Sequence, residues 1–308
     1  MHKKNQTSVT TFLLLGFQNH HSLNILLFLV FLIFYMVTIT GNLLIILSVS
    51  IFKSLNSPMY LFLCQLSICD ILITSNIVPY MLHVILRKEE IISFIGCMTQ
   101  FYLFGTFATT ECILLAVMSY DRYVAICNPL QYVSLMDTTK CFNLTILSWL
   151  IGFILMLFTV FQVSRLNFCG SNVIDHFFCD LAPLLLLSCS DISFVEIENF
   201  ILGFPATFCP FTFIIATYIY IFTTIIRIPS SIGRQKAFST CSSHLTIVCI
   251  YYGTLVAAYL FLSKEKTSNV SKVISLLYTV VTPLLNPIIY SLRSKEIKTS
   301  LVKLIAIM

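Results

Sequence analysis

The sequence predicts an all-α membrane protein, a bundle of seven transmembrane helices, and composition and hydropathy lead to that prediction. Of the 308 residues, 58% are hydrophobic and only 10% are charged, whereas a soluble domain carries about 25% charged residues. The mean hydropathy is +0.94. Seven apolar stretches also reach the length of about 20 residues that a helix needs to cross about 30 Å of hydrocarbon. Composition therefore excludes a fold that faces water on all sides.

The first 22 residues precede the first span and are predicted to form an extracellular tail. They are mostly polar, so they lack the apolar run of about 7–15 residues that a cleavable signal peptide needs. The first span is then expected to insert the chain. One domain covers residues 1–308, and its predicted spans are residues 23–49, 58–85, 97–123, 142–163, 198–226, 237–262 and 273–292.

The last 16 residues, 293–308, are predicted to form a cytoplasmic tail with a short amphipathic helix. Ile297, Leu301, Leu304 and Ile305 share one face, and Lys295, Lys298 and Lys303 lie off it. A helix of this kind lies on the membrane surface, with its apolar side in the lipid and its basic side toward the headgroups. Membrane lipid is therefore an expected partner.

The distribution of basic residues orients the bundle. The loops on one side, together with the C-terminal tail, carry an excess of Lys and Arg, whereas acidic residues balance the basic ones on the other side. The basic side faces the cytoplasm, so the N-terminus lies outside and the C-terminus inside. Asn5 begins an Asn-Gln-Thr glycosylation sequon, which functions only on the outer side.

Four cysteines gather at the predicted outer face. Cys169, Cys179 and Cys189 lie in the long connection between the fourth and fifth spans, and Cys97 begins the third span. The outer face is oxidising, so disulfides are expected there. Four cysteines allow three pairings, and spacing alone does not choose among them.

Five local motifs carry a resemblance to a known family. They are residues 58–63 (PMYLFL), 119–127 (SYDRYVAIC), 176–180 (HFFCD), 236–245 (KAFSTCSSHL) and 283–290 (PLLNPIIY). In this order, and at these ends of the predicted spans, they resemble the odorant receptor family of rhodopsin-like G-protein-coupled receptors over essentially the whole chain. Ser119 is a small departure, because the family usually has Ala there.

The resemblance implies a multi-pass plasma-membrane receptor for smell. It would bind a small, neutral volatile in the outer half of the bundle and activate a heterotrimeric G protein of the stimulatory olfactory type, which raises cAMP. The alternatives are a receptor for another small ligand, such as an amine or a peptide, and a transporter or channel, which would show repeat symmetry and a charged path. An enzyme is not expected, because the sequence contains no His-Glu-x-x-His or Gly-x-Ser-x-Gly motif. No nucleic acid partner is expected.

The resemblance also implies the outer disulfides and the ligand site. It pairs Cys97 with Cys179 and Cys169 with Cys189, so that the long loop covers the bundle. The implied ligand site contains Phe104, Gly105, Ala108, Thr109, Gly203, Ala206, Thr207, Tyr252, Leu255, Val256, Tyr259 and Thr279. Ordinary helix packing is the alternative role for each of them. This set contains no Lys, Arg, Asp or Glu, and the hydroxyls of Thr109, Tyr252, Tyr259 and Thr279 are its polar groups, so a neutral ligand is expected.

The activation switch is implied at the cytoplasmic end. Arg122 is expected to pair with Asp121 at rest and to turn toward the G protein on activation; the alternative is an Arg that only reaches the interface. The residues implied in the switch are Asp121, Arg122, Tyr123, Tyr218, His244, Asn286, Pro287 and Tyr290.

Two carboxyl groups, Asp70 and Glu111, lie inside predicted spans. Each costs several kcal/mol if it is left unpaired in the lipid. They are expected to form an inward-facing polar cluster with Asn42 and Asn286. In related receptors such a cluster binds sodium, so the resemblance makes a sodium ion a candidate at Asp70 and Glu111, and no other cofactor is expected. The alternative is a pair of protonated buried carboxyls.

His176, Cys179 and Asp180 are close in sequence and resemble a set of metal ligands. A cysteine held in a disulfide is a poor ligand, so a packed loop histidine is the preferred interpretation and no metal site is predicted.

Overall fold

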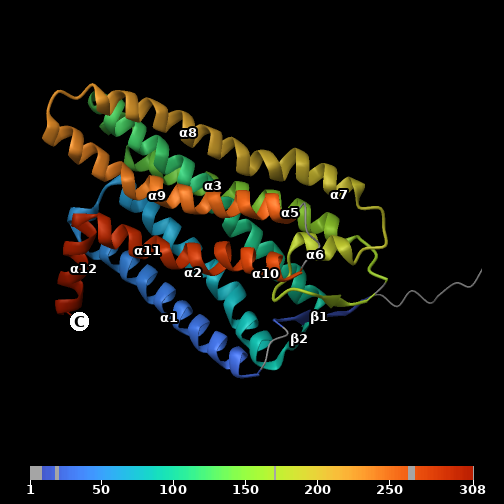
Figure 1. The fold of residues 1–308 in the computed structure, drawn as a ribbon. Helices are drawn as coiled ribbons and strands as arrows, with labels where there is room; N and C mark the ends of the chain where they lie inside the picture. Colours follow the sequence, from blue (N-terminus) through green and yellow to red (C-terminus); the bar gives the residue numbers. More distant parts are fainter. Residues whose placement is uncertain (1–8, 18–20, 170, 263–267, 308) are drawn as a thin grey trace, which may run out of the picture.

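The computed structural model describes residues 9–17, 21–169, 171–262 and 268–307, and it is mainly helical (Figure 1). Within these residues, seven helical segments are long and apolar enough to cross a membrane. They are α1 (His21–Ile51), α2 (Pro58–Arg87), α3 (Phe94–Cys127), α5 (Thr138–Ser164), α7–η3–α8 (Ser193–Glu198, Asn199–Gly203, Phe204–Ile226), α9 (Ser231–Leu262) and α10–η4–α11 (Ser268–Leu276, Leu277–Val281, Thr282–Arg293). Asn5 lies outside the described residues.

Local sequence explains where several of these helices begin and end. The Ser93 side chain accepts a hydrogen bond from Gly96 N at 3.1 Å, and Asp137 accepts one from Lys140 N at 2.7 Å. These N-caps satisfy amide groups that have no partner inside the helix. Pro58 stands at the start of α2, where a missing N–H costs nothing. Lys88 ends the same helix in the left-handed region, with φ of 67°.

Two spans contain a π-helical turn, at Asn199–Gly203 in the fifth and at Leu277–Val281 in the seventh. A π turn inserts an extra residue into the helix and shifts the side chains that follow it. Pro205 follows the first turn, and Pro283 follows the second. The sequence-based spans treated both segments as continuous helices, because hydropathy does not register such a turn.

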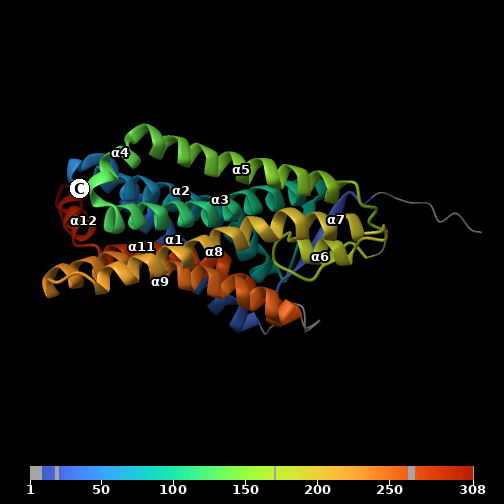
Figure 2. The same cartoon turned by 90° about the horizontal axis from the view of Figure 1, so that it is seen from above.

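Helix α3 is the central element. It packs against α2, α5, α8 and α9, and in Figure 2 it runs between α5 and α8. In α1 and α5, only 17% of the most apolar window is buried, against 56% in α2 and α3. The first and fourth spans therefore present most of their surface to the lipid.

The buried hydrophobic residues form two clusters. The outer cluster includes Phe12, Ile77, Phe177 and Phe178 and lies under the outer loops. The inner cluster includes Phe62, Leu66, Leu115, Ile221 and Tyr290 and lies toward the end that carries the Asp-Arg-Tyr sequence. The bundle is thus packed at both ends.

A three-stranded sheet of order β2–β1–β3 lies at the outer end. β1 (Thr11–Leu15) pairs antiparallel with β2 (Glu89–Ser93) and parallel with β3 (Val173–Ile174). Phe12 and Leu14 of β1 are fully buried. These residues belong to the predicted extracellular tail, for which no strand was predicted. Four consecutive apolar residues are a weak local signal, and the partner strands are about 80 and 160 residues away.

The chain ends in α12 (Lys295–Ile307), which follows α11 across a break at Ser294 and contacts α1 and α11. Ile297 and Leu304 are buried, whereas Lys298 and Lys303 are exposed. The amphipathic pattern of the sequence thus corresponds to a helix with one face against the bundle. The side chains of Lys295 and Ile305 lie outside the description.

Candidate functional site

The outer cap is attached to the bundle by two disulfides. Cys97 at the start of α3 is joined to Cys179, with Cα atoms 5.5 Å apart, and Cys169 is joined to Cys189, at 6.0 Å. These are the pairings that the resemblance implied. Both Cys97 and Cys179 are fully buried, so the first bond fixes the long loop directly over α3.

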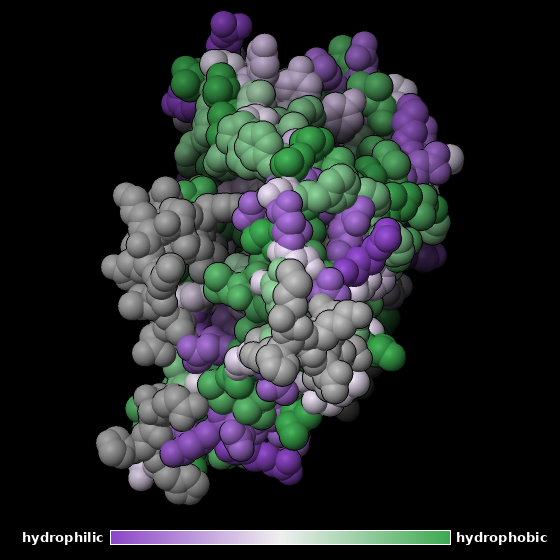
Figure 3. Space-filling model, turned by 90° about the vertical axis from the view of Figure 1, so that its right-hand side faces the viewer, coloured by the Kyte–Doolittle hydropathy of each residue, from purple (hydrophilic) through white to green (hydrophobic). Residues whose placement is uncertain are grey.

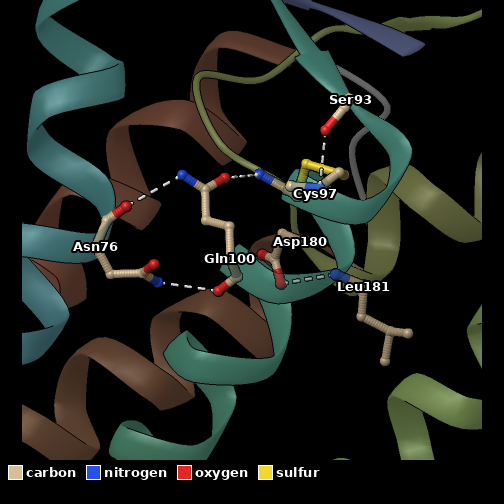
Figure 4. The surroundings of a disulfide bond; sticks show 8 residues. Asn76, Ser93, Cys97, Gln100, Asp180 and Leu181 are labelled. Carbon is tan, nitrogen blue, oxygen red and sulfur yellow. Dashed lines mark hydrogen bonds between the residues drawn. A yellow bond between two sulfur atoms is a disulfide. The ribbon is translucent and has the colours of Figure 1, made fainter. Parts of the chain in front are cut away.

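A hydrogen-bond network surrounds the Cys97–Cys179 bond (Figure 4). The Gln100 Oε1 atom accepts from Cys179 N at 3.0 Å, and Gln100 Nε2 donates to Asn76 O at 3.1 Å. The Asn76 side chain donates in turn to Gln100 O at 2.9 Å. One amide side chain therefore links α2, α3 and the loop at the point where the disulfide joins them.

His176 is buried in this cap, and Asp180 is half-buried beside it. His176 Nε2 lies 3.1 Å from Ser275 Oγ, and its ring contacts Phe177 and Phe178. Burial, and secondly the positive charge of Lys272, lower the pKa of His176 to about 3. Burial also raises the pKa of Asp180, which accepts from Leu181 N and Tyr278 Oη. Across the described residues, no group of three His, Cys, Asp or Glu side chains is placed to hold a metal ion.

Below the cap lies a cavity of about 710 Å³. Volumes of this size are typical of small-molecule sites. Helix α3, the π turn η3 and helix α8 together supply more than half of its lining residues. Of the twelve residues that the sequence analysis placed at the ligand site, eight line it: Phe104, Gly105, Ala108, Thr109, Gly203, Ala206, Thr207 and Leu255.

Three of the predicted ligand residues do not belong to the cavity lining. Tyr252 is buried and stacks on Phe211, with ring centres 4.5 Å apart. Val256 is 47% exposed on the outer side of α9. Thr279 is buried in the π turn of the seventh span and donates to Ser275 O. In each case the rotation of the helix about its axis points the side chain away from the cavity. The fourth residue, Tyr259, has a side chain that lies outside the description.

The cavity wall contains residues that the sequence analysis missed. They lie on α5 (Leu155, Met156, Thr159), on α6 (Leu181–Leu186), and at Tyr251 and Tyr278. The sequence feature that could have indicated the part of the wall on α5 is Gly105, a glycine inside a span. In the structure, a Cβ atom at this position would overlap the Met156 side chain. A close approach of α3 and α5 at this depth follows from that contact.

The cavity wall also contains three carboxyl groups that the predicted ligand set does not, those of Glu111, Asp180 and Glu196. Glu111 lies about one turn below Ala108 on the same face of α3. Asp180 is brought in by the disulfide of its neighbour Cys179. Glu196 is exposed at the rim. Glu111 and Asp180 already accept hydrogen bonds from protein donors.

The polar cluster forms at the bottom of the cavity. Asn286 Nδ2 donates to both Asp70 oxygens, at 3.0 and 3.1 Å, and lies 3.4 Å from Glu111 Oε1. All three side chains are buried. Asn42 instead donates to Thr38 O and Pro283 O. The structure thus joins three of the four predicted residues directly, and Asn42 supports the backbone of the seventh span.

The predicted switch residues lie at the inner end. Arg122 Nε donates to Asp121 Oδ2 at 2.8 Å, and Tyr132 Oη donates to Asp121 Oδ1 at 2.8 Å. Tyr218 Oη lies 2.8 Å from His244 Nδ1. The Arg122 side chain is thus paired with Asp121 and largely shielded from solvent.

The remaining switch residues pack around this group. Tyr123 contacts Tyr220 with ring centres 6.1 Å apart. Tyr290 is buried, and its hydroxyl is one of the buried polar atoms without a hydrogen bond in the described part of the chain. Pro287 lies against Gly41, where a Cβ atom would come within 3.2 Å of the proline ring. An unpaired buried hydroxyl costs about 1–3 kcal/mol.

Comparison with known proteins gives consistent results. Residues 31–307 match the sequence profile of a family described as olfactory receptor. Olfactory receptor 11L1 of Homo sapiens is 47% identical over 303 residues, which cover 98% of this chain and 94% of the relative. Olfactory receptor 6B9 of Mus musculus is 46% identical over 303 residues, with 98% and 96% coverage. The crystal structure of squid rhodopsin superposes with a TM-score of 0.74 at 18% identity, covering 93% of this chain and 82% of rhodopsin.

Proposed function

The chain belongs to the olfactory receptor family, and on this premise we propose that it recognises a small, neutral volatile in the cavity beneath the outer cap and signals by raising cAMP. The family assignment makes the protein a multi-pass plasma-membrane receptor that couples an odorant to a heterotrimeric G protein. The class of ligand and the stimulatory type of G protein are the proposal.

The single observation that carries the ligand proposal is the chemistry of the cavity wall. Phe104, Leu155, Leu202 and Leu255 give it a largely apolar surface. Among the residues that the structure describes, no Lys or Arg belongs to the lining, so an anionic ligand would find no counter-ion there. Thr109 and Thr207 offer hydroxyl groups for one or two hydrogen bonds. Shape and apolar contact would then supply most of the affinity, at about 25 cal/mol per Å² of buried apolar surface.

A path from ligand to switch supports the signalling proposal. Glu111 contributes to the cavity wall and also lies within reach of Asn286 in the polar cluster. Asn286 belongs to the same helix, α11, as Pro287 and Tyr290. A ligand that shifts α3 at Ala108 would therefore move a residue of the cluster one turn away, and α11 would transmit the shift to the inner end.

A second candidate is a protonated amine, which the carboxylates of Glu111, Asp180 and Glu196 at the cavity favour. Two of these carboxylates already accept hydrogen bonds from protein donors, and the third lies at the rim. A buried ion pair also has to offset the desolvation of both charges. The neutral ligand is preferred for these reasons.

We propose that a sodium ion binds at Asp70 and Glu111. Asn286 is a shared amide donor to both buried carboxyl groups. A neutral amide does not compensate two negative charges that lie close together, so a cation between them would stabilise the ionised pair. Oxygen ligands suit a hard cation of this kind.

The test is a panel of neutral, amine and acid volatiles in cells that express the receptor, a stimulatory olfactory G protein and a cAMP reporter. Thr109→Val and Ala108→Phe are run beside the parent. We expect neutral compounds to activate the parent, Ala108→Phe to abolish the response by filling the cavity, and Thr109→Val to weaken only ligands with a hydrogen-bonding group. Activation by amines alone, with loss of response in Glu111→Gln, would establish the second candidate instead.

A further inference from the structure

The ligand cavity is bounded on one side by residues that also form the outer surface of the bundle. Phe200 and Phe204 contribute to its wall and are nevertheless 70% and 44% exposed. They stack in sequence with Phe208, with ring centres 5.8 and 5.0 Å apart. Residues that line a cavity and face outward at once mark the place where the cavity reaches the surface.

The opposite side of this opening is the outer half of α5. Leu155, Met156 and Thr159 line the cavity. Leu157, their neighbour, is 61% exposed and belongs to the lipid-facing surface of the same helix. The opening therefore lies between two membrane spans, the fourth and the fifth, where the surrounding medium is lipid.

The packing of the helices explains the opening. Helix α3 packs on both α5 and α8 and runs between them in Figure 2. The π turn at Asn199–Gly203 lies at the same level and contributes Asn199, Phe200, Leu202 and Gly203 to the cavity wall. Here Thr159 Oγ1 donates to Glu198 Oε1 at 2.7 Å, and Glu198 Oε2 is buried with no hydrogen bond to the described residues. A single polar contact thus links α5 to α7 beside the opening.

The outer cap covers the side of the cavity that faces the extracellular water. Phe177 and Phe178 are fully buried, and Phe178 contacts Phe104 with ring centres 5.4 Å apart. Asp180 accepts a hydrogen bond from Tyr278, which joins the cap to the seventh span. Leu186 on α6 and Phe194 and Ile197 on α7 are exposed. Hydrophobic surface is visible at this outer end of the molecule in Figure 3.

We propose that the ligand reaches the cavity from the outer leaflet of the membrane, through a lateral portal between α5 and the α7–η3–α8 segment. The portal is lined by Leu155, Met156, Thr159, Phe200 and Phe204. This inference rests on the proposed function, because it names the access route to that ligand site. A neutral apolar volatile dissolves in lipid readily, since each CH₂ group favours the apolar phase by about 0.8 kcal/mol. The bilayer then concentrates the ligand at the portal.

The experiment measures access to the cavity without an odorant. Ala108→Cys places a thiol in the cavity wall, and the receptor is reconstituted in lipid nanodiscs. N-phenylmaleimide, which partitions into lipid, is compared with a charged methanethiosulfonate, which stays in water. Each rate is normalised to the rate of the same reagent with glutathione, and labelling of residue 108 is followed by mass spectrometry. We expect the lipophilic reagent to be favoured severalfold.

The portal itself is tested with Leu155→Trp, which adds bulk to its wall, and the matched control is Leu157→Trp on the lipid face of the same helix. Labelling by N-phenylmaleimide should slow severalfold in the first and stay unchanged in the second. The proposal is overturned if the charged reagent labels residue 108 as fast as the lipophilic one, or if Leu155→Trp labels at the parent rate. Should Leu155→Trp fail to fold, the comparison of the two reagents on Ala108→Cys decides by itself. Neither readout involves the odorant or the G protein, so a receptor found to respond to amines would leave this inference standing.

Discussion

Acidification should destabilise the folded receptor through one buried histidine. His176 is 1% exposed in the outer cap, and its surroundings lower its pKa to about 3. In an unfolded chain a histidine titrates near pH 6.5. Between about pH 6.5 and pH 3, His176 is therefore protonated in the unfolded state but neutral in the folded state. Stability is lost progressively as the pH falls through this range.

The magnitude follows from the two pKa values. Each pH unit within that window costs about 1.4 kcal/mol, so a change from pH 7.5 to pH 5 should remove about 2 kcal/mol of stability. The groups that face His176 are Lys272, Asp175 and Ser275. Asp180 has the opposite effect on stability. Burial raises its pKa, so the folded state binds this proton more tightly than the unfolded state, and protonation at low pH favours the folded state.

The assay is thermal unfolding of the purified receptor between pH 7.5 and pH 5, for the parent and for His176→Gln. Gln removes the titrating ring and keeps a polar group near Ser275, so the melting temperature of the variant should depend less on pH. His83→Gln, at an exposed position on α2, is the matched control and should follow the parent. Equal pH dependence in His176→Gln and the parent would refute the reasoning, whatever the absolute stability of the variant.

Three further predictions concern the disulfides, the switch and the cation. Replacing Cys97 and Cys179 by Ser should lower the free energy of unfolding by about 2–5 kcal/mol. Replacing Cys169 and Cys189 should lower it by about 1 kcal/mol less, because that disulfide closes a loop of sequence separation 20 rather than 82. Thermal unfolding under non-reducing conditions measures both losses, and equal losses would contradict the loop-closure argument. Asp121→Asn should raise cAMP in the absence of ligand, because it weakens the contact that holds Arg122. Tyr132→Phe should give a smaller rise, since it removes one hydrogen bond of 2.8 Å to Asp121. Basal cAMP at the parent level in Asp121→Asn would contradict the role of the Asp121–Arg122 contact at rest. Sodium chloride should raise the melting temperature relative to choline chloride in the parent but not in Asp70→Asn or Glu111→Gln, and an equal response in all three would exclude a sodium ion at this cluster.

Linear sequence carries the membrane architecture because hydropathy and charge are properties of segments. Seven apolar stretches, the basic side and the amphipathic end of the chain can each be identified without contacts between distant residues. The disulfide pairs and the Asp-Arg-Tyr switch came from the resemblance. The resemblance also implied residues on α3 and on α8, such as Ala108 and Ala206, which line the cavity.

Tertiary structure alone decided which side chains meet. Tyr252, Val256 and Thr279 turn away from the cavity because helix rotation and the π turn at Leu277–Val281 are set by packing between spans. The strand at Thr11–Leu15 exists only because partners far along the chain supply its hydrogen bonds. Glu111 joins the cavity to the polar cluster through Asn286, which is 175 residues away. Hydrophobicity is a local property of the chain and can be counted, whereas a contact depends on the relative placement of two segments, which no single segment specifies.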